Sequence, residues 1–181
     1  EPLSERHIAV LVRTNNEAEL MQETLRSLGI PSVRHQTGNV FETREAKEIQ
    51  RLLTAVSEPR DFGLLRAALS TGLLGMRGED LVRLEGDSDD WEGIIDLFQG
   101  YNRLWHEKGF IRMMRRLLSE HRIVSRTVSM PGGERRATNL LHLLELLQQA
   151  SAGRRTPEAL LKWLSEHIEG GTGEQDEHLI R

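Results

Sequence analysis

The chain contains no cysteine among its 181 residues. This absence excludes disulfide bonds, thiolate zinc sites and cysteine nucleophiles, and it suits the reducing cytoplasm, where we expect the protein to reside. The seven histidines include no pair spaced four residues apart beside carboxylates, which is the pattern that a zinc site on a helix needs. We therefore expect no metal site in the chain itself.

Long hydrophobic runs are missing as well. No apolar stretch approaches the roughly 18 residues that a membrane-spanning helix requires. The first six residues, Glu1 to Arg6, do not have the pattern of a signal peptide. We expect no membrane partner.

A phosphate-binding loop of the form G-x-x-x-x-G-K-[ST] is also absent. Gly72, Gly75 and Gly78 are spaced too regularly and too loosely to form a dinucleotide-binding turn. No set of Ser, His and Asp can be recognised as a nucleophilic site. The chain by itself is therefore predicted to bind neither ATP nor Mg²⁺ and to carry no complete active site.

Positive charge is not in excess, because the net charge is -4. A nucleic-acid-binding role is not favoured by this total, but the charge is unevenly distributed. Residues 77–100 contain two basic and eight acidic residues, whereas residues 101–126 contain seven basic and two acidic ones. The second segment predicts a local basic face, and a solvated helix pair with mutual salt bridges accounts for it equally well.

The beginning of the chain has the pattern of an α/β protein. Residues 8–12 form a continuous apolar run typical of a strand buried on both faces, and residues 14–29 have helical periodicity. Residues 31–36 indicate a second short strand. We therefore predict a β-α-β unit with a parallel sheet and a right-handed crossover.

The remainder is predicted to be mainly helical. Thr43 can cap a helix that extends to about residue 56, and Thr156 followed by a proline and an acid is a good helix start. Further helices are predicted at about 60–70, 78–85, 88–107, 109–122, 134–152 and 156–168. Two strands do not make a stable parallel sheet, so we expect a piece of a larger protein; a small α/β domain with few strands is the alternative.

Two stretches, "IAVLVRTNNEAELMQETLRSLGIPS" and "GNVFETREAKEI", resemble the superfamily 1 DNA helicases of the UvrD/Rep/PcrA type. The stretches "VFETREA", "GGERRATNLLHLLELLQQA" and "WLSEHI" are similar to the RecB branch, the beta subunits of exodeoxyribonuclease V. Val12 stands where UvrD-like members usually have an aromatic residue, and Thr43 stands where they have an arginine. Both departures favour the RecB branch.

The resemblance implies an organisation and a function. Residues 1–76 would be the first part of the second RecA-like motor domain, residues 77–169 the helical insertion called subdomain 2B, and residues 170–181 a connector back to the motor. The parent would be an ATP-dependent DNA helicase and exonuclease that processes double-strand breaks for recombinational repair. Its cofactors would be ATP and Mg²⁺, and its partners would be DNA and RecC-like and RecD-like subunits.

The resemblance also implies roles for particular residues. Arg13 would be the arginine that reaches the γ-phosphate of ATP bound on the first motor domain, in the full-length protein. The motif loop would comprise Phe41, Glu42 and Glu45 near the nucleotide cleft, although for Phe41 we favour the simpler role of filling the core beneath the loop. Candidate contacts to DNA phosphates are Arg112, Arg115, Arg116, Arg135 and Arg136.

The same residues also fit alternatives that involve no motor. The arginines could belong to a solvated face or contact a partner subunit. The whole chain could be a stand-alone, non-catalytic DNA-binding or protein-interaction module, or a small α/β regulatory domain.

Overall fold

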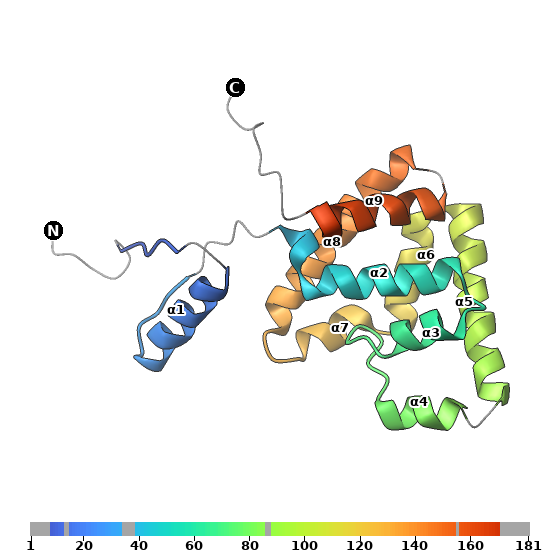
Figure 1. Ribbon diagram of the computed structural model, residues 1–181, viewed down its shortest axis with the longest axis horizontal. Coiled ribbons are helices and arrows are strands. Elements are labelled where there is room, and N and C mark those ends of the chain that lie inside the picture. The colour runs from blue at the N-terminus through green and yellow to red at the C-terminus, as the bar shows by residue number, and fades with distance from the viewer. Residues whose placement is uncertain (1–7, 13–14, 34–38, 86–87, 155, 171–181) are drawn as a thin grey trace. The chain divides into compact units, whose positions relative to one another are not determined.

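The computed structural model describes residues 8–12, 15–33, 39–85, 88–154 and 156–170. The chain divides into two compact units, Glu1–Gly38 and Asn39–Arg181 (Figure 1). Within the described ranges the chain is mostly helical and contains no strand. The mainly helical part of the prediction is thus confirmed, and the β-α-β start is not observed.

The first unit contains helix α1, Asn15–Ser27, close to the predicted range. Gly29 ends it in the left-handed region at φ 73°. Its N–H donates to Arg26 O at 3.0 Å, and the N–H of Ile30 donates to Leu25 O at 2.9 Å. This pair of bonds satisfies carbonyl groups that the end of a helix leaves free, and a side chain at Gly29 would disfavour the required backbone angle.

Residues 8–12, predicted as a strand, form no regular secondary structure, and their apolar side chains are exposed, with Leu11 at 96%. In the second predicted strand, residues 31–33 are not in a strand, and residues 34–36 lie outside the described residues. A strand requires a neighbour for its backbone N–H and C=O groups. An apolar run therefore predicts a strand correctly only where a neighbouring strand is present to pair with it.

The second unit is an all-helical assembly over its described residues (Figure 1). It starts with a 3₁₀ turn, η2, at Val40–Glu42. The helices are α2 (Arg44–Ser57), α3 (Phe62–Leu69), α4 (Gly78–Glu85), α5 (Ser88–Lys108), α6 (Phe110–Glu120), α7 (Ile123–Val128), α8 (Gly133–Gly153) and α9 (Pro157–Glu169). The predicted helices agree with these bounds closely, apart from η2 and α7.

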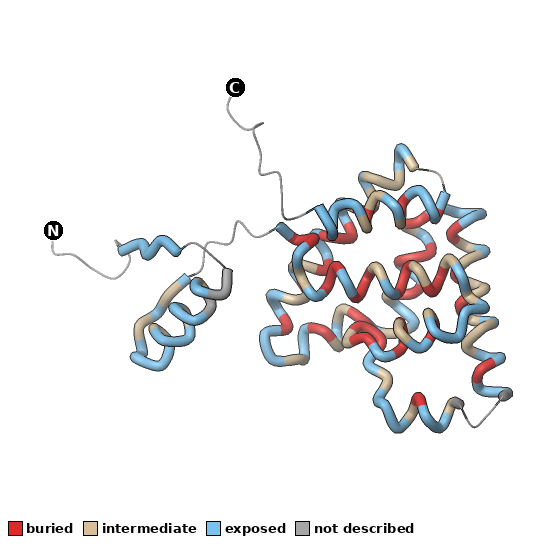
Figure 2. The backbone as a smooth tube through the Cα atoms, viewed as in Figure 1, coloured by how far each residue is buried: buried red, intermediate tan, exposed pale blue. Residues whose placement is uncertain are grey.

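Helix α2 is the centre of this unit and contacts α3, α5, α8 and α9. Thr43 caps it as predicted, because its hydroxyl oxygen accepts from the N–H of Ala46 at 3.3 Å. Ile49, Leu52 and Leu53 are fully buried along its length. Figure 2 shows α2 as a largely buried helix within the bundle.

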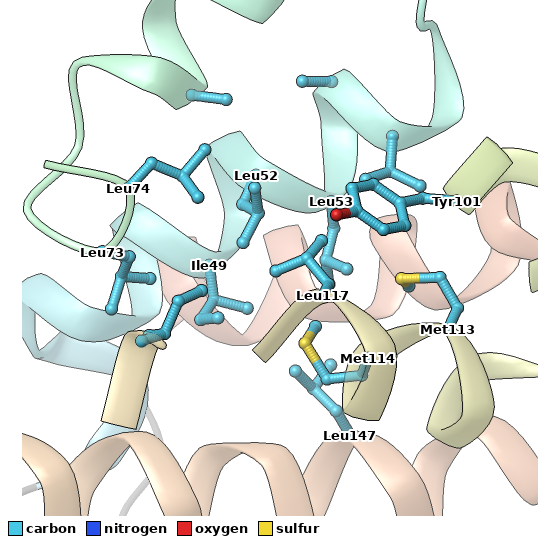
Figure 3. Packing of buried hydrophobic residues seen from close by; sticks show 14 of the residues in the cluster. Ile49, Leu52, Leu53, Leu73, Leu74, Tyr101, Met113, Met114, Leu117 and Leu147 are labelled. Atoms are coloured by element: carbon cyan, nitrogen blue, oxygen red, sulfur yellow. The ribbon is translucent and has the colours of Figure 1, made fainter. Parts of the chain in front are cut away.

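Helix α6 also contributes to the core. Phe110, Met113, Met114 and Leu117 recur at helical spacing and are all buried. In Figure 3, Leu117 of α6 lies beside Leu53 of α2, Met113 lies near Tyr101 of α5, and Met114 lies beside Leu147 of α8. Burying apolar stripes from both helices stabilises the unit by about 25 cal/mol for each Å² removed from water.

Three residues with a positive φ lie at the boundaries of consecutive helices. Gly109 at φ 84° separates α5 from α6, and Gly132 at φ 67° precedes α8. Arg122 has φ 49°, a left-handed angle that is uncommon for residues other than glycine. Because of this residue, the helix predicted over 109–122 ends at Glu120, and the short helix α7 begins after Arg122.

The boundary between the compact units differs from the expected domain boundary at 76/77. Residues 39–76 belong with the later helices, because α2 packs against α5, α8 and α9. None of the described helices combines the length and the apolar character needed to cross a membrane.

Candidate functional site

The first two turns of α2 carry two buried carboxylates. Glu45 and Glu48 are each only 3% exposed, although both have charged side chains. The guanidinium of Arg136, from α8, faces both. Its Nε donates to Glu45 Oε1 at 2.7 Å, whereas its Nη2 is 3.5 Å from Glu48 Oε2, a buried oxygen that accepts no hydrogen bond from the described residues. Asn139, one turn further along α8, donates to Glu45 Oε2 at 3.2 Å. We call Glu45, Glu48, Arg136 and Asn139 the α2–α8 cluster.

The charges of the α2–α8 cluster are balanced by one more arginine. Arg44 Nε is 2.6 Å from Glu48 Oε1, and the Arg44 side chain is 71% exposed. Two carboxylates thus face two guanidinium groups, which offsets the cost of removing the charges from water. Gly72 lies against the cluster, since a Cβ there would be 3.2 Å from Glu48 Oε1.

The motif loop is folded by its own polar groups. The side chain of Asn39 accepts from the N–H of Phe41 at 3.0 Å, and the Thr43 hydroxyl donates to Val40 O at 2.6 Å. Phe41 is buried against α9, with its ring centroid 5.5 Å from that of Trp163. Glu42 is exposed to solvent.

The loop residues therefore have three different environments. Phe41 fills the core beneath the loop, which was one of the two predicted alternatives. Glu45 is directed inward to Arg136 and Asn139, and among the three only Glu42 is exposed. The burial of Glu45 was not predicted, because a glutamate in the first turn of a helix normally faces water near the positive end of the dipole.

The five candidate DNA-contacting arginines also differ in exposure and in ion pairing. Arg112, Arg115 and Arg135 are exposed. Arg116 is exposed too, but its Nε is bound to Glu120 Oε1 at 2.8 Å, and its guanidinium lies 5.9 Å from the Tyr101 ring centroid. Arg136 is held in the α2–α8 cluster with 20% of its side chain exposed. A DNA contact by Arg136 remains a prediction, against which this ion pair argues.

A residue that the sequence did not single out joins this basic face. Arg115 and Arg122 line a shallow surface hollow between the end of α6 and the start of α7. Its other lining residues are Leu118, Ser119, Val124 and Ser125. The left-handed backbone of Arg122 places the turn there. The sequence contained no signal for it, because the helical periodicity runs through residue 122 without interruption.

A second polar cluster lies at the end of α6. The Tyr101 hydroxyl donates to Glu120 Oε2 at 2.6 Å and lies 3.1 Å from His121 Nε2. Burial, together with the Glu120 carboxylate, raises the pKa of Tyr101 well above its usual range. The hydrogen bonds from Tyr101 and Arg116 lower the pKa of Glu120. Burial lowers the pKa of His121, despite the neighbouring carboxylate.

The described acidic and histidine side chains do not form a metal-binding group. No three His, Asp or Glu side chains within the described ranges gather as metal ligands. The carboxylates of the α2–α8 cluster are already paired with arginines. Arg13, the predicted γ-phosphate contact, lies outside the described residues. Within the described part of the chain, the ion pairs of Arg136 join α8 to α2, whereas Arg44–Glu48 and Arg116–Glu120 each lie within one helix.

Comparison with known proteins places these features in a family. A family model of the UvrD-like helicase C-terminal domain matches residues 3–169. The chain is 39% identical, over 92% of its length, to the RecBCD enzyme subunit RecB of Escherichia coli, and 37% identical over 91% to that of Haemophilus influenzae. It is 30% identical, over 95% of its length, to the subunit of Mycobacterium tuberculosis.

The chain spans 14% of the length of the first two relatives and 16% of the third. The predicted resemblance to UvrD/Rep-type helicases of the RecB branch is confirmed by these matches. Because the family model covers nearly all of its residues, the chain belongs to the UvrD-like helicase C-terminal domain family.

Proposed function

We propose that the chain is a segment of the beta subunit of a RecBCD-type ATP-dependent helicase and exonuclease that acts in the repair of double-strand breaks. The observation that carries this proposal is the family match across residues 3–169, together with identity to three RecB subunits along almost the whole chain. The parent would work in the cytoplasm on DNA with RecC-like and RecD-like subunits. It would need ATP and Mg²⁺, bound by residues outside this chain.

In the parent, residues 8–12 and 31–36 would be strands of the second RecA-like motor domain, within the predicted range 1–76. The exposure of Leu11 and of Val33, at 96% and 97%, supports this proposal. Apolar side chains that stand in water gain free energy when neighbouring strands cover them. The assignment of 77–169 to the helical insertion and of 170–181 to a connector likewise remains a prediction.

Arg13 would provide the chain's contribution to ATP hydrolysis. It directly follows the predicted strand 8–12, and ligands of open α/β sheets bind beyond the carboxyl ends of the strands. A guanidinium remains charged at all working pH values and can bridge two phosphate oxygens. It would therefore stabilise the charge that develops on the transferred phosphoryl group.

The test of this function is Arg13→Ala in the full-length protein. We expect the DNA-stimulated rate of ATP hydrolysis to fall about 10²-fold, the usual cost of losing one preorganised donor to a developing charge. Arg13→Lys should not restore the rate, because an ammonium group lacks the planar pair of N–H donors with which a guanidinium binds two phosphate oxygens. Arg26→Ala, at an exposed arginine of the same unit, is the matched control. An unchanged rate in Arg13→Ala would contradict the proposal.

The exposed arginines of α6 and α8 would contact DNA phosphates. Arg112, Arg115 and Arg135 have the best access, whereas Arg116 and Arg136 already bind carboxylates. Each phosphate contact releases condensed counterions, so it makes the logarithm of the affinity more steeply dependent on salt. A basic face of this kind would position the duplex without reading its sequence.

Neutralising these contacts gives a measurable prediction. In the full-length protein, Arg112→Gln with Arg115→Gln should reduce the slope of log affinity against log salt by about 0.9 for each lost contact with duplex DNA. The control pair is Arg51→Gln with Arg60→Gln, which removes the same charge from exposed positions elsewhere. DNA binding is measured by fluorescence anisotropy over a salt series. Equal slopes for the two pairs would mean that only the overall charge matters.

A further inference from the structure

The α2–α8 cluster joins parts of the chain that are far apart in the sequence. Glu45 and Arg136 are separated by 91 positions, and Glu45 and Asn139 by 94. The expected boundary at 76/77, between motor and insertion, falls between the two partners. A buried ion pair thus crosses the place where the family resemblance would put a division between subdomains.

Arg136 uses its guanidinium in three directions. Its Nε donates to Glu45, its Nη2 faces Glu48, and its Nη1 lies 3.4 Å from the sulfur of Met130. Glu45 in turn has both oxygens bound to α8, one by Arg136 and one by Asn139. An arginine is suited to such a site because its planar fork holds two carboxylates at fixed angles, which the single ammonium of lysine does not.

The motif loop is also fixed from a second side. Phe41 packs edge-on against Trp163 and lies 5.1 Å, between ring centroids, from His167 of α9. The loop between Asn39 and Glu45 is consequently held to α8 by charge and to α9 by aromatic packing. Helices α8 and α9 contact each other as well as η2. Any displacement of this helix pair would have to break buried contacts or carry the loop with it.

We infer that Arg136 is a positioning residue, which fixes the motif loop to α8 so that the loop and the α8–α9 pair move as one body. The consequence for catalysis rests on the proposed function. If α8 and α9 move when the parent binds DNA, the motif loop beside the nucleotide cleft would move with them. Glu42, exposed at the outer side of the loop, is free to face that cleft. Arg136 then acts on the loop through its hydrogen bond to Glu45.

The experiment compares Arg136→Gln, Arg136→Lys and Arg51→Gln in the full-length protein. Arg51 is an exposed arginine on α2, so its variant matches the charge change without touching the cluster. Hydrogen exchange followed by mass spectrometry reports on residues 40–48, and ATP hydrolysis is measured with and without DNA. In Arg136→Gln we expect exchange in 40–48 to rise roughly tenfold, since the first turn of α2 opens more often.

The same variant should lose the stimulation of ATP hydrolysis by DNA. We expect the ratio of DNA-stimulated to DNA-independent rates to fall about fivefold or more, the lower end of ordinary coupling between sites. Arg136→Lys should recover this ratio only in part, and Arg51→Gln should leave both exchange and ratio unchanged. A residue with a merely structural role would not move the ratio.

The two readouts separate failure of this inference from failure of the proposed function. Unchanged exchange in Arg136→Gln would overturn the fixed loop, whatever the chain's activity. Faster exchange with an unchanged ratio would overturn the positioning role. A wild-type parent without DNA-stimulated ATP hydrolysis would instead overturn the proposed function, while the exchange result would still decide whether Arg136 fixes the loop.

Discussion

Replacing Gly133 by alanine is expected to destabilise the second unit by about 4 kcal/mol, which is at the upper end of single-residue effects. Gly133 is the first residue of α8 and lies against the end of α7. A Cβ atom there would fall well inside van der Waals contact of the carbonyl oxygens of Thr127 and Val128, and 2.7 Å from the Val128 carbonyl carbon. All three are backbone atoms, so no side chain can turn aside to relieve the clash.

Two other glycines are suitable controls for Gly133→Ala. Gly132 has φ 67° and open space around it, so Gly132→Ala should cost only about 1–2 kcal/mol, from the left-handed angle. Gly100 lies inside α5 with no atom within 4 Å of a Cβ, and Gly100→Ala should stabilise by about 0.4–1 kcal/mol. Urea unfolding of the three variants of this chain measures the series. A Gly133→Ala variant no less stable than Gly132→Ala would show that α7 and α8 can separate without cost.

The pair Gly132-Gly133 illustrates what the sequence can and cannot predict. The motif "GGERRATNLL" carries part of the family resemblance, and the helix that follows it is predicted nearly to the residue. Nothing in the pattern indicates that one glycine supplies a left-handed turn and the other a close approach between helices. Close approach depends on residues 127 and 128, which belong to α7, a helix that the sequence pattern did not predict.

Helix starts were predicted well because their determinants are local. Thr43 and Thr156 cap α2 and α9 with their own hydroxyl groups, and each cap can be recognised from a few neighbouring residues. The β-α-β start depended on strand partners that an apolar run over 8–12 cannot provide by itself. Secondary structure that requires distant partners is therefore where the prediction and the described structure diverge.

The surroundings of the candidate site residues differ from the prediction for the same reason, because they too depend on distant partners. Exposed arginines on α6 follow from helical periodicity, because Arg112 and Arg115 lie off the apolar stripe that begins at Phe110. The opposite environment of Arg136 depends on Glu45, which is 91 positions away. Two adjacent arginines, Arg135 and Arg136, look alike in sequence and yet have different surroundings, one in solvent and one beside buried carboxylates.

Removing the charge of Arg136 is the second change expected to have a large effect on stability. Arg136→Met would leave Glu45 and Glu48 buried, with Arg44 still paired to Glu48. Breaking a buried ion pair from one side typically costs about 3–5 kcal/mol, because the remaining charge stays out of water. We expect a loss in that range, measured by urea unfolding of the chain at neutral pH.

Removing the charge of Glu45 should destabilise the chain less than removing that of Arg136. The difference between the two losses tests whether Arg136 contacts both carboxylates. In Glu45→Gln, Arg136 retains Glu48 and part of its access to water, so the loss should be about 1–2 kcal/mol, near that of an ordinary charged hydrogen bond. Arg44→Met should cost about 1 kcal/mol or less, because Arg44 is mostly exposed.

The double variant Glu45→Gln with Arg136→Met completes a thermodynamic cycle. If the two side chains interact as the 2.7 Å distance indicates, the double variant will be more stable than the sum of the single losses predicts, by about 0.5–3 kcal/mol. Glu45→Gln removes one of the two buried negative charges that Arg136→Met leaves without Arg136, and the charge of Glu48 remains. Additive losses would mean that Glu45 and Arg136 contribute independently, and then neither could hold the motif loop to α8.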